Sequence, residues 1–201
     1  MKNKIHIIFI VLILNVISIS FAKEQSYKII KLVNNQVITN YDLEMRLQLF
    51  SFLNKVSIDE KSISGYAKQM LNLMIDEKIQ LEHINKYQIN IEINKVDEYI
   101  AEAILKPNQS ISELERDLKT NNIDIKILKE SIMIQLGWNE LSGKLFFRTA
   151  EITDIDLSNT MEKNASLSED QARNLIIQRQ IELRAKKLLR DLRSEANIEN
   201  R

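Results

Sequence analysis

The chain has 201 residues, and its 28 lysines and arginines balance its 28 aspartates and glutamates, so the formal net charge is zero. This balance argues against a nucleic-acid-binding protein that relies on a strong positive field, and the absence of cysteine excludes disulfide frameworks and cysteine-ligated metal sites. With 3 glycines and 1 proline, the sequence also disfavours a turn-rich all-β sandwich or barrel, and its length fits one or two domains.

The first 22 residues have the order of a secretory signal peptide. A short basic start precedes an apolar run over 5–19, and small residues at Ser20 and Ala22 fit a cleavage site. We therefore expect cleavage after Ala22 and a periplasmic location. The alternative is a retained membrane anchor, but the apolar run is shorter than the roughly 20 residues that a spanning helix needs.

A short β-hairpin is expected directly after this segment. Residues 27–33 and 36–38 are rich in Ile, Val and Leu, and the pair Asn34-Asn35 between them favours a turn, because Asn tolerates positive φ. Thr39 and Asp42 then have the spacing of a capping box, with Asp in place of Glu. This pattern predicts a helix over 41–53.

Helical spacing of apolar residues continues over most of the remaining chain. Further helices are expected over 64–86, 95–105, a short stretch after 112, 124–145, a short stretch after 153, and 168–196. Their expected N-terminal caps are Asn94, Ser112 with Glu115, Thr153 with Asp156, and Ser168 with Gln171. We expect an extended connector over 89–93, a helix over 124–145 that is loosened at Gly137 and Gly143, and a brief final strand over 197–199.

The residues that carry catalysis are scarce. His83 is the one histidine after the signal segment, and its apolar neighbours favour a packing role. The sequence has no G-x-S-x-G turn, no glycine-rich phosphate loop and no metal-ligand spacing. The basic residues of the last helix alternate with acidic ones, which favours a solvated, ion-paired face. We therefore predict a protein that is not an enzyme and binds no cofactor, metal or nucleic acid.

Two of the expected helices carry more apolar surface than a single buried face requires. In the helix over 41–53, one stripe contains Leu43, Leu47 and Phe50, and another contains Met45, Leu49, Phe52 and Leu53. In the helix over 124–145, one stripe contains Ile125, Leu128, Ile132 and Leu136, and another contains Ile127, Ile134, Trp138, Leu141 and Leu145. The surplus stripes are either core or the wall of an open groove, and the sequence leaves both interpretations open.

A groove of this kind would bind a flexible apolar polypeptide weakly, through contact with adaptable side chains. The candidate peptide-binding residues are Met45, Leu49, Phe52, Met70, Met74 and Trp138. For each of them, the alternative role is that of an ordinary core residue.

The order of motifs resembles the SurA-type periplasmic chaperones. The segment 33–43 resembles the opening motif of that family, 71–81 its second helix, 94–97 its capped third helix, and 189–199 its C-terminal helix and final strand. The match covers most of 27–150 and again 168–200.

The resemblance implies a mainly α fold: a SurA N-domain-like module over 23–201, with a small hairpin and a long C-terminal helix that completes the core. The segment 23–150 forms its N-terminal part, 151–167 a short connector and 168–201 the last helix. The implied function is ATP-independent binding of unfolded outer-membrane or envelope proteins, a role in outer-membrane biogenesis.

Members of that family usually carry parvulin-type isomerase domains before the last helix. Here only about 15 residues, 153–168, occupy that place, so isomerase activity is not expected. The alternatives are an envelope adaptor with one fixed partner, or a protein related to the peptidyl-prolyl isomerases. A homo-oligomer in which two copies exchange their last helices is a further alternative.

Overall fold

The computed structural model describes residues 27–201, so the predicted signal segment lies outside the described residues. Within this range the chain is mainly helical with one small sheet, and the predicted fold class is confirmed. The helices are α2 (Asn40–Asn54), α3 (Ile63–Lys86), α4 (Ile93–Ala103), α5 (Ile111–Thr120), α6 (Ile125–Phe146), the 3-10 turn η1 (Phe147–Thr149), α7 (Asp154–Lys163) and α8 (Glu169–Glu195). The strands are β1 (Ile29–Val33), β2 (Gln36–Thr39) and β3 (Ile198–Asn200).

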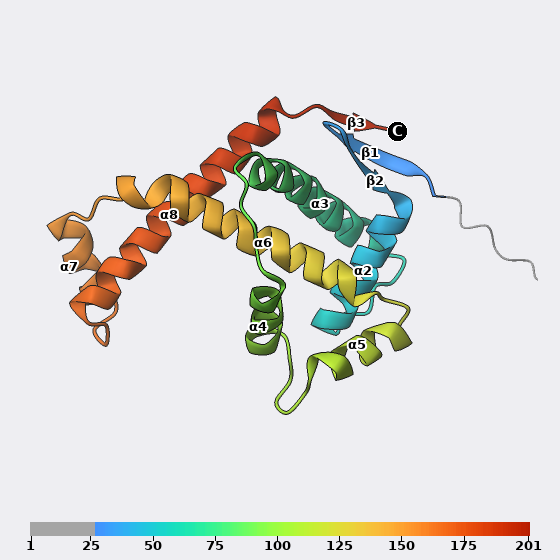
Figure 1. Ribbon diagram of the computed structural model, residues 1–201, viewed down its shortest axis with the longest axis horizontal. Coiled ribbons are helices and arrows are strands. Elements are labelled where there is room, and N and C mark those ends of the chain that lie inside the picture. Colours follow the sequence, from blue (N-terminus) through green and yellow to red (C-terminus); the bar gives the residue numbers. More distant parts are fainter. Residues whose placement is uncertain (1–26) are drawn as a thin grey trace, which may run out of the picture.

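The sheet joins the two ends of the described chain. Its strand order is β2-β1-β3, with both pairings antiparallel, so the predicted hairpin and the predicted final strand are confirmed. Asn34 adopts a φ of 50° in the hairpin turn, as expected of an Asn at this position. Val33 pairs with both Gln36 and Ile198. Figure 1 shows β1 between the other two strands.

Three of the predicted helix caps are confirmed. Thr39 and Ser168 each form a capping box, in which the cap side chain accepts a backbone N–H and the N3 side chain accepts the N–H of the cap residue. Thr153 caps α7 by accepting the N–H of Asp156. These polar side chains set where the helices begin.

Two predicted caps are wrong by two residues. The cap of α5 is Ser110 with Glu113, because Ser-x-x-Glu occurs in two overlapping registers and the earlier one starts the helix. In α4 the cap position is Glu92, and Asn94 lies inside the first turn. The earlier start gives α4 a full first turn before Val96, which is fully buried.

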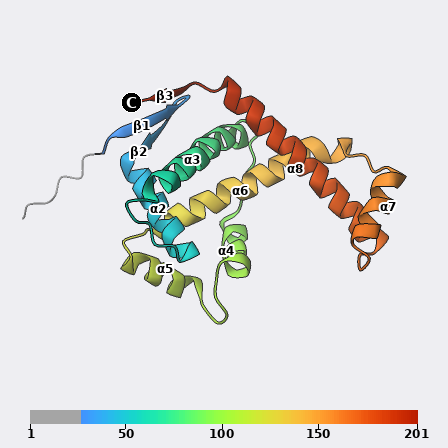
Figure 2. The ribbon, with the colours of Figure 1, turned by 180° about the vertical axis from the view of Figure 1, so that it is seen from behind.

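Helix α6 is the central element of the molecule, and it lies beside α3 in both views of the ribbon (Figures 1 and 2). The expected loosening at Gly137 and Gly143 is wrong, because α6 is continuous from end to end. Gly137 instead permits close packing: a Cβ added there would lie 3.1 Å from Cδ1 of Ile84 on α3. The missing side chain lets the two helices approach.

The core has two parts. The larger surrounds α6 and includes Leu49 of α2, Ile84 of α3, and buried residues of α4 and α5. The smaller lies between the sheet and α3; its buried members are Val33, Ile38, Met74, Ile75 and Ile79. The C-terminal part of α8 packs on both through Leu189 and Leu192.

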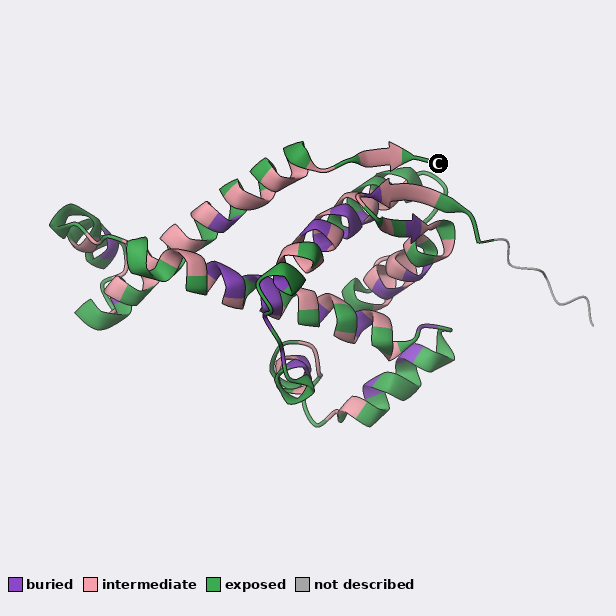
Figure 3. Ribbon diagram, turned by 45° about the horizontal axis from the view of Figure 1, so that its top comes forward, coloured by how far each residue is buried: buried purple, intermediate pink, exposed green. Residues whose placement is uncertain are grey.

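Helix α8 crosses α6 and reaches α3, where Arg193 donates to Asn72 Oδ1 at 2.7 Å and forms an ion pair with Asp76. Its N-terminal half extends away from the sheet together with α7 (Figure 1). Figure 3 shows that this arm is mostly exposed, whereas the buried residues concentrate along α3 and α6. Within residues 27–201, none of the helices combines the length and the apolar character needed to cross a bilayer.

Candidate functional site

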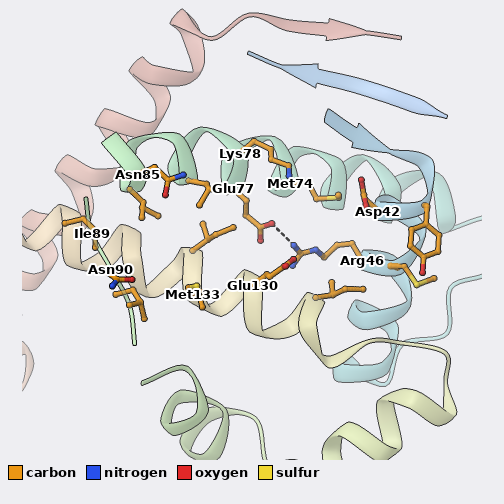
Figure 4. A pocket seen from close by; sticks show the side chains of 17 residues that line it. Asp42, Arg46, Met74, Glu77, Lys78, Asn85, Ile89, Asn90, Glu130 and Met133 are labelled. Atoms are coloured by element: carbon orange, nitrogen blue, oxygen red, sulfur yellow. Dashed lines mark hydrogen bonds and ion pairs between the residues drawn. The ribbon is translucent and has the colours of Figure 1, made fainter. Parts of the chain in front are cut away.

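A groove of about 540 Å³ opens between α2, α3 and α6. The connector from α3 to α4, residues 87–92, lines one end of it through Ile89, Asn90 and Ile91. Figure 4 looks into this groove, with α3 on one side and α6 on the other. The volume falls within the range of a few hundred to a thousand Å³ that is typical of ligand-binding pockets.

The walls of the groove are mainly aliphatic and thioether side chains. Those apolar lining residues are Met45, Met74, Leu81, Ile84, Ile89, Ile91, Ile127, Met133 and Ile134. Met133 is 37% exposed, so part of this apolar surface faces solvent. Three of the lining residues are methionines, whose unbranched side chains adapt to guests of different shape.

An ion pair lies within the apolar walls. Arg46 Nη2 of α2 donates to Glu77 Oε2 of α3 at 2.6 Å, and Ser131 Oγ of α6 donates to Glu77 Oε1 at 2.9 Å (Figure 4). The side chains of Arg46 and Glu77 are only 12% and 10% exposed. Together with Ser131, this pair links the three helices that form the groove.

Burial dominates the titration of Glu77. It raises the pKa of the carboxyl above its ordinary value of 4.5, while the positive charge of Arg46 and the hydrogen bond from Ser131 act in the opposite direction. The carboxylate is held by two partners on two other helices, so it joins the walls of the groove.

The six predicted peptide-binding residues occupy different places. Met45 and Met74 line the groove, although each is only 6% exposed. Leu49 and Trp138 are buried in the larger core, and Phe52 packs against it partly buried. Met70 is buried as well, at 4% exposed.

Sequence reasoning missed much of the groove lining, above all Met133, Ile89 and Ile91. Ile127 and Ile134 belong to a predicted surplus stripe of the helix over 124–145, and both line the groove. Trp138 and Leu141 of the same stripe are buried in the core instead. The stripe is thus divided along its length between groove and core.

The residues suited to catalysis or metal binding are not gathered at one point. His83 Nδ1 lies 3.2 Å from the carbonyl oxygen of Ile79, four residues earlier on the same helix. Among residues 27–201, no three or more His, Cys, Asp and Glu side chains are placed to hold a metal ion. What the groove offers is apolar contact with one buried charge pair.

Two curated proteins are similar to this chain. The chaperone SurA of Buchnera aphidicola subsp. Schizaphis graminum is 34% identical over 113 residues, which are 54% of this chain and 26% of that protein. The chaperone SurA of Saccharophagus degradans is 22% identical over 138 residues, which are 67% of this chain and 32% of that protein. These matches support a SurA-like relationship. The matched region spans only about a quarter to a third of the length of these relatives, and no family model matches the chain.

Proposed function

We propose that this protein is an ATP-independent periplasmic chaperone that holds unfolded outer-membrane or envelope proteins in the groove between α2, α3 and α6. The similarity to two SurA chaperones supports a chaperone function in general. The single observation that carries the proposal is the open apolar groove, because a chaperone without an energy source has to bind its clients through contacts that are weak and reversible.

In this proposal Met45 and Met74 contact the client together with Met133 at the more exposed edge. Leu49, Phe52, Met70 and Trp138 act on client binding indirectly, by holding the helices that form the walls. A cleaved signal peptide over 1–22 would deliver the protein to the periplasm, and residues 23–201 would function as one domain.

Suppression of aggregation tests the proposal. An unfolded β-barrel protein is diluted from urea into buffer with and without an equimolar amount of the purified protein, and light scattering is followed. We expect the scattering to fall in its presence without ATP. Unchanged scattering at equimolar and tenfold excess would overturn the proposal.

Two methionines offer a matched pair of variants. Met133 in the groove and Met161 on α7 are 37% and 36% exposed, and both are on helices. Met133→Glu places a charge among apolar walls and should abolish most of the suppression. Met161→Glu adds the same charge outside the groove and should leave suppression unchanged. Equal effects of the two variants would locate client binding elsewhere.

An envelope adaptor with one fixed partner is the second candidate. An adaptor is expected to recover one protein in stoichiometric amount from a periplasmic extract, whereas a chaperone binds many unfolded peptides weakly. Isomerase activity is not part of the proposal, and a proline-limited refolding reaction should not accelerate when the protein is added.

Exchange of α8 between two copies is compatible with the proposed chaperone. A swapped dimer would preserve the contacts that α8 makes with α3 and α6, but would take them from the neighbouring copy. Sedimentation velocity distinguishes the monomer from this dimer.

A further inference from the structure

A second, smaller hollow lies next to the groove. It has a volume of about 270 Å³ and lies between α4 and α6. Its lining residues are Ile91, Lys95, Glu98, Tyr99, Glu102, Leu136 and Glu140. Ile91 lines both hollows, so they adjoin at this residue. It belongs to the connector that runs from α3 to α4 (Figure 1).

The two hollows follow one helix. The groove uses α6 from Ile127 to Ile134, and the second hollow uses Leu136 and Glu140. At 1.5 Å per residue, the stretch from 127 to 140 is about 20 Å long. An extended polypeptide advances about 3.3 Å per residue, so about six residues of a client would span both hollows.

The charges of the lining residues are not balanced, although those of the whole chain are. Six carboxylates line the two hollows, against three basic side chains. The acidic residues are Asp42, Glu77, Glu130, Glu98, Glu102 and Glu140, and the basic ones are Arg46, Lys78 and Lys95.

Some of these carboxylates already have cationic partners. Glu77 pairs with Arg46, and Glu140 pairs with Lys144 at 2.8 Å. Glu98 and Glu102 of α4 have no ion-pair partner within residues 27–201. The excess of negative charge is therefore greatest in the second hollow.

The other walls of the second hollow suit the stem of a long basic side chain. Leu136 and Ile91 are apolar, and Tyr99 is a partly buried aromatic residue whose hydroxyl lies 3.2 Å from Gln135 Nε2. The methylene groups of Lys or Arg pack along such surfaces while the charged end stays near water and carboxylates. A guanidinium group is also attracted to the face of a tyrosine ring.

We propose that the two hollows together bind one extended client segment that contains apolar residues and a Lys or Arg. The apolar residues lie in the groove, and the Lys or Arg side chain lies in the second hollow. This inference rests on the proposed chaperone function and adds a sequence preference to it. Apolar contact in the groove supplies most of the affinity, and the carboxylates of Glu98 and Glu102 select clients that carry a positive charge at the right distance.

Two fluorescein-labelled eight-residue peptides test the inference. Both carry the same valine and leucine residues, and one central position is arginine in the first and the neutral isostere citrulline in the second. Fluorescence anisotropy at low ionic strength should show about three- to tenfold tighter binding of the arginine peptide, the effect of one or two ion pairs with exposed carboxylates. The difference should shrink at high salt.

Charge-neutral variants locate the effect. In Glu98→Gln/Glu102→Gln, the affinities for the arginine and citrulline peptides should become about equal. The control Glu115→Gln/Glu195→Gln removes the same charge from exposed positions of α5 and α8 and should retain the preference.

Equal affinity of both peptides for the unmodified protein would overturn the charge preference and leave the proposed chaperone function intact. Failure of both peptides to bind would overturn both. A preference that survives Glu98→Gln/Glu102→Gln would place the cation site outside the second hollow and so contradict the inference.

Discussion

Asn34 and Asn197 are 163 residues apart in the chain and are joined by two hydrogen bonds. The Asn34 N–H donates to the carbonyl oxygen of Asn197 at 2.8 Å, and the Asn197 N–H donates to Asn34 Oδ1 at 2.9 Å. These bonds tie the hairpin turn to the residue that precedes β3. The first and last elements of the described chain are thereby part of one structure.

Removal of residues 197–201 should therefore destabilise the whole module. The deletion loses β3 and its hydrogen bonds to β1, and it uncovers Val33, which is fully buried. At about 1 kcal/mol for each lost hydrogen bond, the free energy of unfolding should fall by about 2–4 kcal/mol. Urea unfolding followed by circular dichroism measures this.

The variant Asn34→Gly serves as a milder control for this deletion. Glycine accepts the positive φ of 50° at this position and removes only the side-chain bonds, so we expect a loss of about 1 kcal/mol. A deletion no more harmful than Asn34→Gly would show that β3 contributes little to stability.

The ion pair in the groove should be costly to break from one side. Glu77→Ala leaves Arg46 buried without its partner, and such losses typically cost about 3–5 kcal/mol. The double variant Arg46→Met/Glu77→Leu removes both charges and should be far less destabilised. Chemical unfolding of the two variants checks this, and an equal loss in both would contradict the assigned role of the pair.

The raised pKa of Glu77 predicts a pH effect of defined sign. Because burial makes the folded protein hold this proton more tightly than the unfolded chain, the contribution of Glu77 to stability increases as pH falls from above its folded pKa toward 4.5. Glu77→Gln removes this contribution. The stability of the unmodified protein relative to Glu77→Gln should therefore rise as the pH is lowered, as urea unfolding at several pH values will show. The opposite trend would contradict a raised pKa.

The two glycines of α6 should respond oppositely to alanine. In Gly137→Ala the new Cβ lies 3.1 Å from Ile84 Cδ1, and we expect a loss of about 1–3 kcal/mol from overpacking between α3 and α6. Gly143 has no atom within 4 Å of an added Cβ, so Gly143→Ala should stabilise the helix by up to about 1 kcal/mol. Thermal unfolding compares the two. Similar melting temperatures would contradict the close packing at Gly137.

The sequence predicted the elements of the fold well because their signals are local. The pair Asn34-Asn35, the caps at Thr39 and Ser168, and the final strand depend on residues that are close in the chain. The shift of the α5 cap to Ser110 shows the limit of this reasoning. Two overlapping Ser-x-x-Glu patterns are indistinguishable without knowing which residues the helix buries.

The groove could be predicted only in part, because its walls depend on how helices cross. Ile134 and Trp138 share a stripe on α6, yet one lines the groove and the other lies in the core. Ile89 and Ile91 belong to a segment whose short alternation predicted only an extended connector, so it did not mark them as lining residues. Ser131 and Arg46 meet Glu77 only through the packing of three helices.

Site-specific photocrosslinking shows whether clients bind in the groove. A benzoylphenylalanine is placed at position 133 in the groove or at position 161 on α7, and each protein is irradiated with an unfolded β-barrel client. We expect a crosslinked client from position 133 and little from position 161. Crosslinks from 161 that equal or exceed those from 133 would contradict the assignment of the groove as the client-binding site.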